Sequence, residues 1–175
     1  MLGNLFNRPR RVFGLIALVC AAMLAFGVIY LQGILELEPC PMCIVQRYCL
    51  IGVGVFSALA ALSRGALGWR LWGLLGIAIG GFGAFTAARQ SWLQWHPPEM
   101  AICGRDLYGM IESFPLQRAI PMIFKGNGDC SAVDWTFLGG TIANWSFVWF
   151  VIFILVILAA LLRRPASTFA AARWR

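Results

Sequence analysis

Residues 12–31 read VFGLIALVCAAMLAFGVIYL and carry no charged side chain. About 20 helical residues cross a hydrocarbon core of about 30 Å, so this stretch predicts one membrane-spanning helix. Three further windows meet the same criterion, at residues 43–62, 71–88 and 145–162. The third is rich in glycine, which favours close helix–helix approach in lipid. The sequence therefore predicts an all-α membrane protein, a four-transmembrane-helix antiparallel bundle forming a single integral membrane domain over residues 1–175.

The composition agrees with a membrane protein and excludes several other classes. The chain is 61% hydrophobic and only 12% charged, with a mean hydropathy of +0.79. Ordinary soluble domains are about 45–50% apolar and about 25% charged, so a water-soluble globular domain and a disordered chain are both excluded. The net charge of +7 does not indicate a nucleic-acid partner, because the basic residues are scattered around the apolar runs rather than clustered.

Charge is divided between the two sides of the predicted spans. Basic residues precede the first span, separate the second from the third and follow the fourth: Arg8, Arg10, Arg11, Arg64, Arg70, Arg163, Arg164, Arg173 and Arg175. All seven acidic residues fall in the other two connections, 32–42 and 89–144. By the positive-inside rule both termini are cytoplasmic and these connections are exported loops. A cleaved signal peptide is the alternative for the first span, but its apolar run exceeds the usual length of about 7–15 residues and no A-x-A-like site follows.

Four of the six cysteines fall in the predicted exported loops. Cys40 and Cys43 lie at the short loop, and Cys103 and Cys130 lie in the long one. Disulfides persist in exported compartments, so the count favours two pairs, one per loop: Cys40–Cys43 and Cys103–Cys130. The other two cysteines lie inside spans, where we expect them to act as small packing residues.

The Cys40-Pro41-Met42-Cys43 motif predicts a redox-active pair. The prolines suit the start of a helix, and the partial positive charge of a helix N-terminus stabilises a thiolate. Arg47 follows one turn deeper, and a cation just inside the membrane indicates function. The alternatives are that Arg47 only snorkels to the headgroups, and that Cys103–Cys130 merely clips an exposed loop. A zinc site is disfavoured because a second C-x-x-C is lacking, and haem attachment because Ile44 replaces the required histidine.

This placement suggests a route for electrons. A soluble dithiol would reduce the long-loop pair, which would reduce the C-x-x-C pair, which would reduce an acceptor dissolved in the bilayer. The sequence contains no flavin, haem or metal motif. A diffusible quinone is therefore the expected acceptor. The competing hypothesis is a non-catalytic four-span scaffold whose disulfides only brace its loops.

The chain resembles the disulfide bond formation protein B (DsbB) family of bacterial inner membranes over nearly its whole length. The resemblance rests on the order and spacing of five groups of residues: Glu38-Pro39-Cys40-Pro41-Met42-Cys43 with Gln46-Arg47; Ala88-Arg89-Gln90 with Trp92-Leu93-Gln94; Cys103-Gly104; Gly128-Asp129-Cys130; and Trp135-Thr136-Phe137-Leu138-Gly139. It implies a multi-pass inner-membrane thiol:quinone oxidoreductase whose redox cysteines face the periplasm.

The resemblance also implies roles for individual residues. Cys103 would form a mixed disulfide with the periplasmic thioredoxin-fold oxidase DsbA, and Cys130 would then pair with Cys40. Cys43 would be released as a thiolate beside ubiquinone or menaquinone, which Arg47 would contact. Arg89, with its neighbour Gln90, is predicted to help close the quinone pocket.

Overall fold

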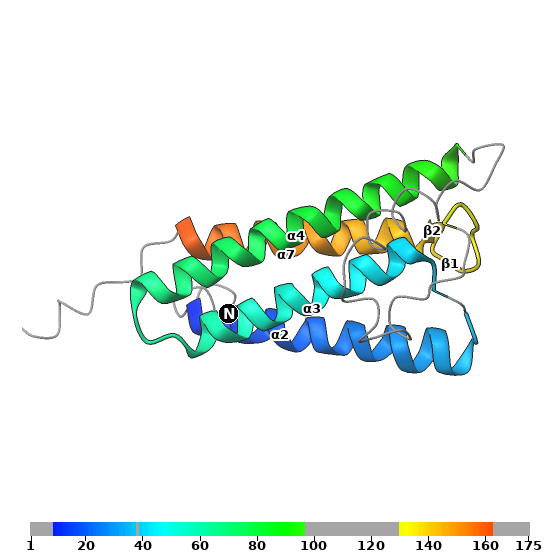
Figure 1. The fold of residues 1–175 in the computed structure, drawn as a ribbon. Helices are drawn as coiled ribbons and strands as arrows, with labels where there is room; N and C mark the ends of the chain where they lie inside the picture. The colour runs from blue at the N-terminus through cyan, green and yellow to red at the C-terminus, as the bar shows by residue number, and fades with distance from the viewer. Residues whose placement is uncertain (1–8, 38, 97–129, 163–175) are drawn as a thin grey trace, which may run out of the picture.

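The structure is a computed structural model that describes residues 9–37, 39–96 and 130–162. Its first helix, α2 (Pro9–Ala25), continues directly into a π-helical segment, η1 (Phe26–Ile34). Three long helices follow: α3 (Pro41–Leu62), α4 (Ala66–Trp95) and α7 (Ile142–Leu162). A two-stranded antiparallel hairpin of β1 (Thr136–Phe137) and β2 (Gly140–Thr141) precedes α7 (Figure 1).

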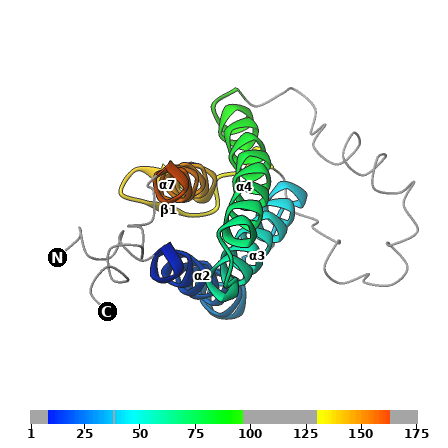
Figure 2. The ribbon, with the colours of Figure 1, turned by 90° about the vertical axis from the view of Figure 1, so that its left-hand side faces the viewer.

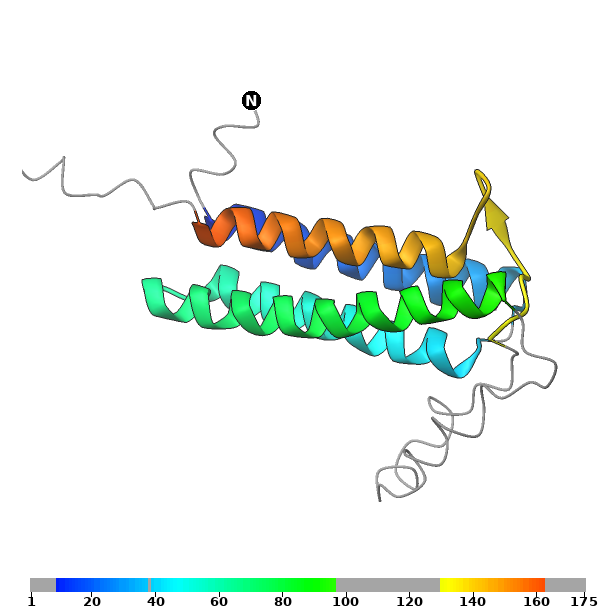
Figure 3. The same ribbon diagram turned by 90° about the horizontal axis from the view of Figure 1, so that it is seen from above.

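The predicted fold class is confirmed. Four helical stretches are long and apolar enough to cross a membrane: Pro9–Ile34, Pro41–Leu62, Leu67–Trp95 and Ile142–Leu162. They lie side by side, and consecutive helices run in opposite directions, so the start of α2 and the end of α7 lie at the same end of the bundle (Figure 3). Viewed along the bundle, α4 packs between α3 and α7, and α2 packs against α3 (Figure 2). The contact between α2 and α7 is smaller, which leaves room between these two helices.

Close packing around α4 confirms the expected use of glycine at some positions but not at others. A Cβ atom on Gly83 would lie 2.6 Å from the ring of Phe150 and 2.9 Å from the Cβ atom of Cys49. A Cβ atom on Gly81 would meet nothing within 4 Å. Cys49 and Cys20 are both buried in this core, 5% and 1% exposed, as expected for packing residues.

The helices extend beyond the predicted windows, most clearly in α4. The predicted third span ended at residue 88, whereas α4 runs to Trp95. The extra turns contain Gln90 and Gln94, which are four residues apart and therefore share a face. Both side chains form hydrogen bonds inside the protein. The helix therefore continues past the point where these polar residues lower the local hydropathy and end the predicted span.

The hairpin was not predicted within the long connection. Its two strands are joined by Leu138 and Gly139, which both have positive φ angles, 50° and 79°. Two-residue connections with positive φ at both positions match the twist of antiparallel strands, and glycine adopts such angles without steric cost. Trp145, at the start of α7, donates its Nε1–H to the carbonyl of Phe137 at 2.9 Å and fixes the hairpin over that end of the bundle.

Candidate redox site

The cysteine pair lies at the first turn of α3. Cys40 is the N-cap residue, and its extended backbone (φ −74°, ψ 160°) turns into the helix at Pro41. Its sulfur accepts a hydrogen bond from the backbone N–H of Cys43 at 3.3 Å. The two Sγ atoms lie 2.9 Å apart as thiols. Because a disulfide bond is about 2.05 Å long, a small side-chain movement suffices to form one.

Cys130 lies at the same place, although it is far from Cys40 in the sequence. It is fully buried in a cluster with Cys40 and Met42, against which Cys43 and Leu93 pack. The pKa of the Cys40 thiol is raised above its ordinary value, first by its hydrogen bond with Cys130, then by that with Cys43 and by burial. Cys40 therefore keeps its proton at neutral pH. Cys103, the fourth predicted redox cysteine, lies outside the described residues.

Two buried glutamines complete the surroundings of the cysteine pair. Gln90, on α4, lies with its Nε2 atom 3.3 Å from the Sγ atoms of both Cys40 and Cys43. Gln46, on α3, donates from its own Nε2 atom to Oε1 of Gln90 at 2.6 Å. The two side chains are only 4% (Gln46) and 3% (Gln90) exposed, so the amide of Gln90 is held against the sulfurs in a site with little water.

Arg47 lies one turn deeper in α3 and is held by the π-helical segment. Its Nη1 atom donates to Oε1 of Gln32 at 2.6 Å, and Nη2 donates to the carbonyl of Gly27 at 3.5 Å. π-Helical turns are rare and are frequently found at functional sites. The guanidinium is thus anchored within the protein, which favours a role in the site over simple snorkelling.

A cavity of about 890 Å³ connects these residues. Cys40, Cys43, Gln46, Arg47 and Gln90 line one part of it, and Gln94, Asp134 and Ser146 are further polar lining residues. The remaining walls are mainly apolar or aromatic and come from α2, η1, α7 and the segment before α7, among them Leu18, Met23, Phe26, Tyr30, Trp135, Phe137, Trp145, Trp149 and Phe153. This volume, with a small number of polar groups among mainly apolar walls, is typical of small-molecule sites. A quinone fits this arrangement, because its ring oxygens need hydrogen-bond donors and its tail needs an apolar channel.

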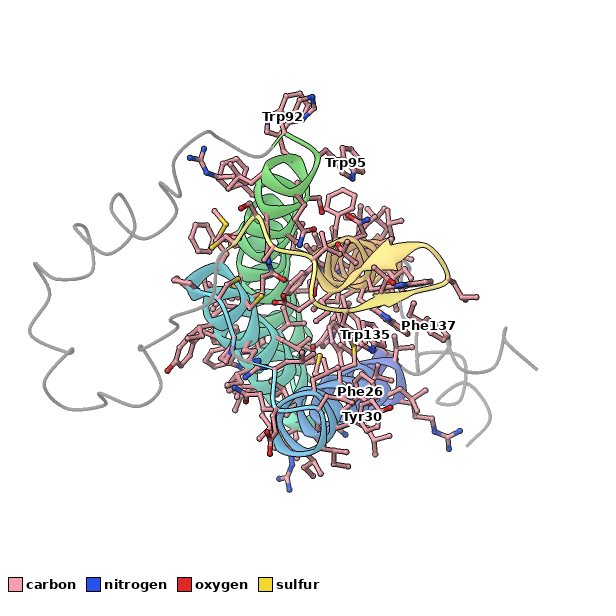
Figure 4. All side chains as sticks on the ribbon, turned by 90° about the vertical axis from the view of Figure 1, so that its right-hand side faces the viewer. Phe26, Tyr30, Trp92, Trp95, Trp135 and Phe137 are labelled. Atoms are coloured by element: carbon pink, nitrogen blue, oxygen red, sulfur yellow. The ribbon has the colours of Figure 1, made fainter. Side chains whose placement is uncertain are left out.

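The aromatic side chains at this end of the bundle are distributed unevenly. Phe26 and Tyr30 stack on η1 with their ring centroids 5.1 Å apart. Figure 4 shows them on the same side of the bundle end as Trp135 and Phe137, whereas Trp92 and Trp95 lie at the far tip of α4. The aromatic part of the cavity therefore lies between η1 and the segment before α7, where α2 and α7 make little contact.

Comparison with known proteins identifies the family. The family model described as disulfide bond formation protein DsbB matches residues 9–160. The chain belongs to this family. Proteins called disulfide bond formation protein B are similar over most of their length: that of Paracidovorax citrulli is 67% identical over 90% of this chain and 89% of its own, and that of Acidovorax sp. is 63% identical over 93% of each. The protein from Polaromonas naphthalenivorans is 59% identical over 91% of this chain and 95% of its own.

The structure separates the predicted site residues of this DsbB-family chain into two groups. Cys40, Cys43, Cys130 and Arg47 all lie at the bundle end described above. Arg89, in contrast, is exposed and is not among the residues that line the cavity, although its neighbour Gln90 is. The prediction that Arg89 closes a quinone pocket therefore stays a prediction.

Three glutamines contribute to the site but were given no role from the sequence, although Gln46 and Gln94 belong to the motifs that carry the family resemblance. Gln46 binds Gln90, and Gln32 binds Arg47. Gln94 donates to the carbonyl of Ala132 at 3.2 Å and accepts from Oγ1 of Thr141 at 2.8 Å, so it ties the segment after Cys130 to α4. Their signal was available, because an uncharged polar residue within or beside a membrane span needs an internal partner.

Proposed function

We propose that this chain is a thiol:quinone oxidoreductase of the bacterial inner membrane, with its redox cysteines facing the periplasm. It would oxidise a DsbA-like periplasmic thioredoxin-fold protein and reduce ubiquinone or menaquinone. Membership of the DsbB family supports the broader function, disulfide bond formation. The observation that carries the finer proposal is the Cys40–Cys43 pair, 2.9 Å apart, which lines a large, mainly apolar cavity beside Arg47.

The proposed reaction balances without any further reagent. The partner's dithiol and one quinone become the partner's disulfide and one quinol, with two electrons and two protons transferred. Within the chain, Cys103–Cys130 would take the electrons from the partner by thiol–disulfide exchange and pass them to Cys40–Cys43. Exchange requires a thiolate to reach a disulfide sulfur, and the burial of Cys130 beside Cys40 supports this path.

Each cavity residue would have a distinct part in this proposal. Cys43 would present its sulfur to the quinone. Cys40 would keep its proton until the Cys40–Cys43 disulfide forms again, when that proton is released. Arg47 would hold the quinone ring and stabilise the negative charge that develops on its oxygen, an interaction that gains strength where water is excluded. The apolar walls would bind the tail.

The test is quinone consumption by the purified protein in detergent. We would mix it with a reduced DsbA-like protein and a soluble ubiquinone analogue, then repeat the series with a menaquinone analogue. Quinone absorbance should fall over many turnovers with wild type and with Cys49→Ser, a matched change of a buried cysteine on the same helix. It should not fall with Cys43→Ser, or when the partner is supplied already oxidised.

The other outcomes contradict the proposal in different ways. Equal quinone loss with Cys43→Ser would keep the enzyme but remove Cys43 from its mechanism. No loss with any protein, across several partners and both quinone types, would favour the scaffold whose disulfides brace its loops.

A further inference from the structure

The amide of Gln90 faces the two cysteine sulfurs with its nitrogen rather than its oxygen. Nε2 lies 3.3 Å from each sulfur, whereas Oε1 lies 3.8 Å from the sulfur of Cys43. An amide NH₂ has two hydrogens, so it can donate to both sulfurs at once. Gln90 is therefore placed to supply two hydrogen bonds to the pair.

Gln46 determines this orientation. It donates to Oε1 of Gln90 at 2.6 Å, which is the shortest contact of the group. A half-turn of the Gln90 amide would place its NH₂ against the NH₂ of Gln46 and its oxygen against the sulfurs. Both glutamines are almost fully buried, so water cannot readily compensate for the lost hydrogen bonds. Gln46 thus keeps the donor of Gln90 directed at the cysteines.

Hydrogen bonds to sulfur do not affect the two redox states equally. A thiolate is a strong acceptor because it carries a full negative charge, and hydrogen bonds to charged groups are stronger than those between neutral groups. A disulfide sulfur is neutral and a weak acceptor. Donors held against the pair therefore stabilise the reduced form more than the oxidised form.

We propose that Gln46 and Gln90 act as a positioning pair that raises the reduction potential of Cys40–Cys43. Gln90 stabilises the reduced cysteines through its amide nitrogen, and Gln46 holds that amide in place. A couple whose reduced form is stabilised is a stronger oxidant. The inference rests on the proposed function, because it treats Cys40–Cys43 as a redox couple, and it adds the residues that set the strength of that couple.

The experiment measures the equilibrium between the cysteine pair and glutathione. One disulfide and two glutathione molecules give one dithiol and one glutathione disulfide. The full-length protein in detergent, with Cys103 and Cys130 replaced by serine so that only one pair titrates, is equilibrated in glutathione buffers of graded ratio. Acid quenching, alkylation and mass spectrometry of the peptide that contains Cys40 and Cys43 then give the equilibrium constant.

Four substitutions in this background separate the roles. Gln90→Leu should shift the constant toward the disulfide by about tenfold, which corresponds to about 30 mV for a two-electron couple. Gln90→Glu should shift it the same way, because a carboxylate offers oxygens instead of donors. Gln46→Leu should give a smaller shift of about threefold. Thr86→Val is the matched control one turn earlier along α4. The buried Thr86 hydroxyl donates to the carbonyl of Phe82 and does not line the cavity, so this variant should leave the constant within twofold of the background.

The outcomes distinguish failure of the positioning role from failure of the proposed redox function. If the background protein forms the disulfide and all four variants share its constant, the positioning role is wrong while the redox pair stands. An equal shift in Thr86→Val and Gln90→Leu would also overturn the inference, because a general loosening of α4 would then explain it. If no Cys40–Cys43 disulfide forms in any buffer, both the inference and the proposed redox function fail.

Discussion

Arg47 shows how much a single residue depends on its neighbours at this site. Its guanidinium is bound by Gln32 and by the carbonyl of Gly27, and it faces the cavity that contains the cysteine pair. Because the loss of a hydrogen bond from a charged group costs about 1.5–3 kcal/mol, Arg47→Ala should raise the KM for quinone roughly tenfold or more. The KM for the reduced partner should change little. Steady-state kinetics with each substrate varied in turn measures both constants.

Arg89→Ala is the matched variant at the same end of the bundle. Its side chain is exposed and outside the cavity lining, so this variant decides the prediction made for Arg89 from the sequence. A rise in the KM for quinone would support that prediction, and unaltered quinone affinity would end it. If Arg47→Ala weakens the use of partner and quinone equally, Arg47 is a structural residue.

At the scale of elements, α4 depends on close contact at one glycine. A Cβ atom on Gly83 would lie 2.9 Å from the Cβ atom of Cys49, which is close to the backbone of α3 and cannot move aside easily. Overpacking of this kind costs about 1–3 kcal/mol. Gly83→Ala should therefore lower the midpoint of thermal unfolding in detergent.

Gly81→Ala supplies the control on the same helix. Nothing lies within 4 Å of a Cβ atom at Gly81, and alanine is favoured over glycine in helices by up to about 1 kcal/mol. This variant should be as stable as wild type or slightly more stable. Equal midpoints for the two variants would show that the α3–α4 contact tolerates the extra methyl group.

The whole molecule is predicted to have one orientation in the membrane. In the predicted topology the two terminal segments and the connection between the second and third spans fall on one side and carry nine basic residues and no acidic residue, and positive charge is retained on the cytoplasmic side. A green fluorescent protein fused after Arg175 should fluoresce, because it matures in the cytoplasm. Alkaline phosphatase, which is active only when exported, should be active when fused after Trp95 and inactive when fused after Arg64. The reverse pattern would contradict the predicted orientation and place the cysteine pair in the cytoplasm.

The number and direction of the helices could be predicted from the sequence because hydropathy is a local property. Each span is recognised by its own residues against the requirement of the lipid, without reference to any other span. The Cys-x-x-C pair was equally local, because three residues of separation at a helix start bring the two sulfurs together. Family membership followed from the same order of motifs along the chain.

The site itself was decided by tertiary structure. Gln90 meets Cys40 across 50 residues of sequence, and Arg47 meets Gln32 on a neighbouring helix. These contacts depend on how each helix is rotated about its axis, and in lipid the hydrophobic pattern fixes that rotation poorly, because lipid-facing and buried surfaces are both apolar. Rotation is set instead by close approach, as at Gly83, and by the need of buried polar groups for partners. The sequence by itself determined the spans, the Cys-x-x-C motif and the arginine one turn after it, whereas tertiary packing decided which amides surround the two cysteines and which residues hold the arginine.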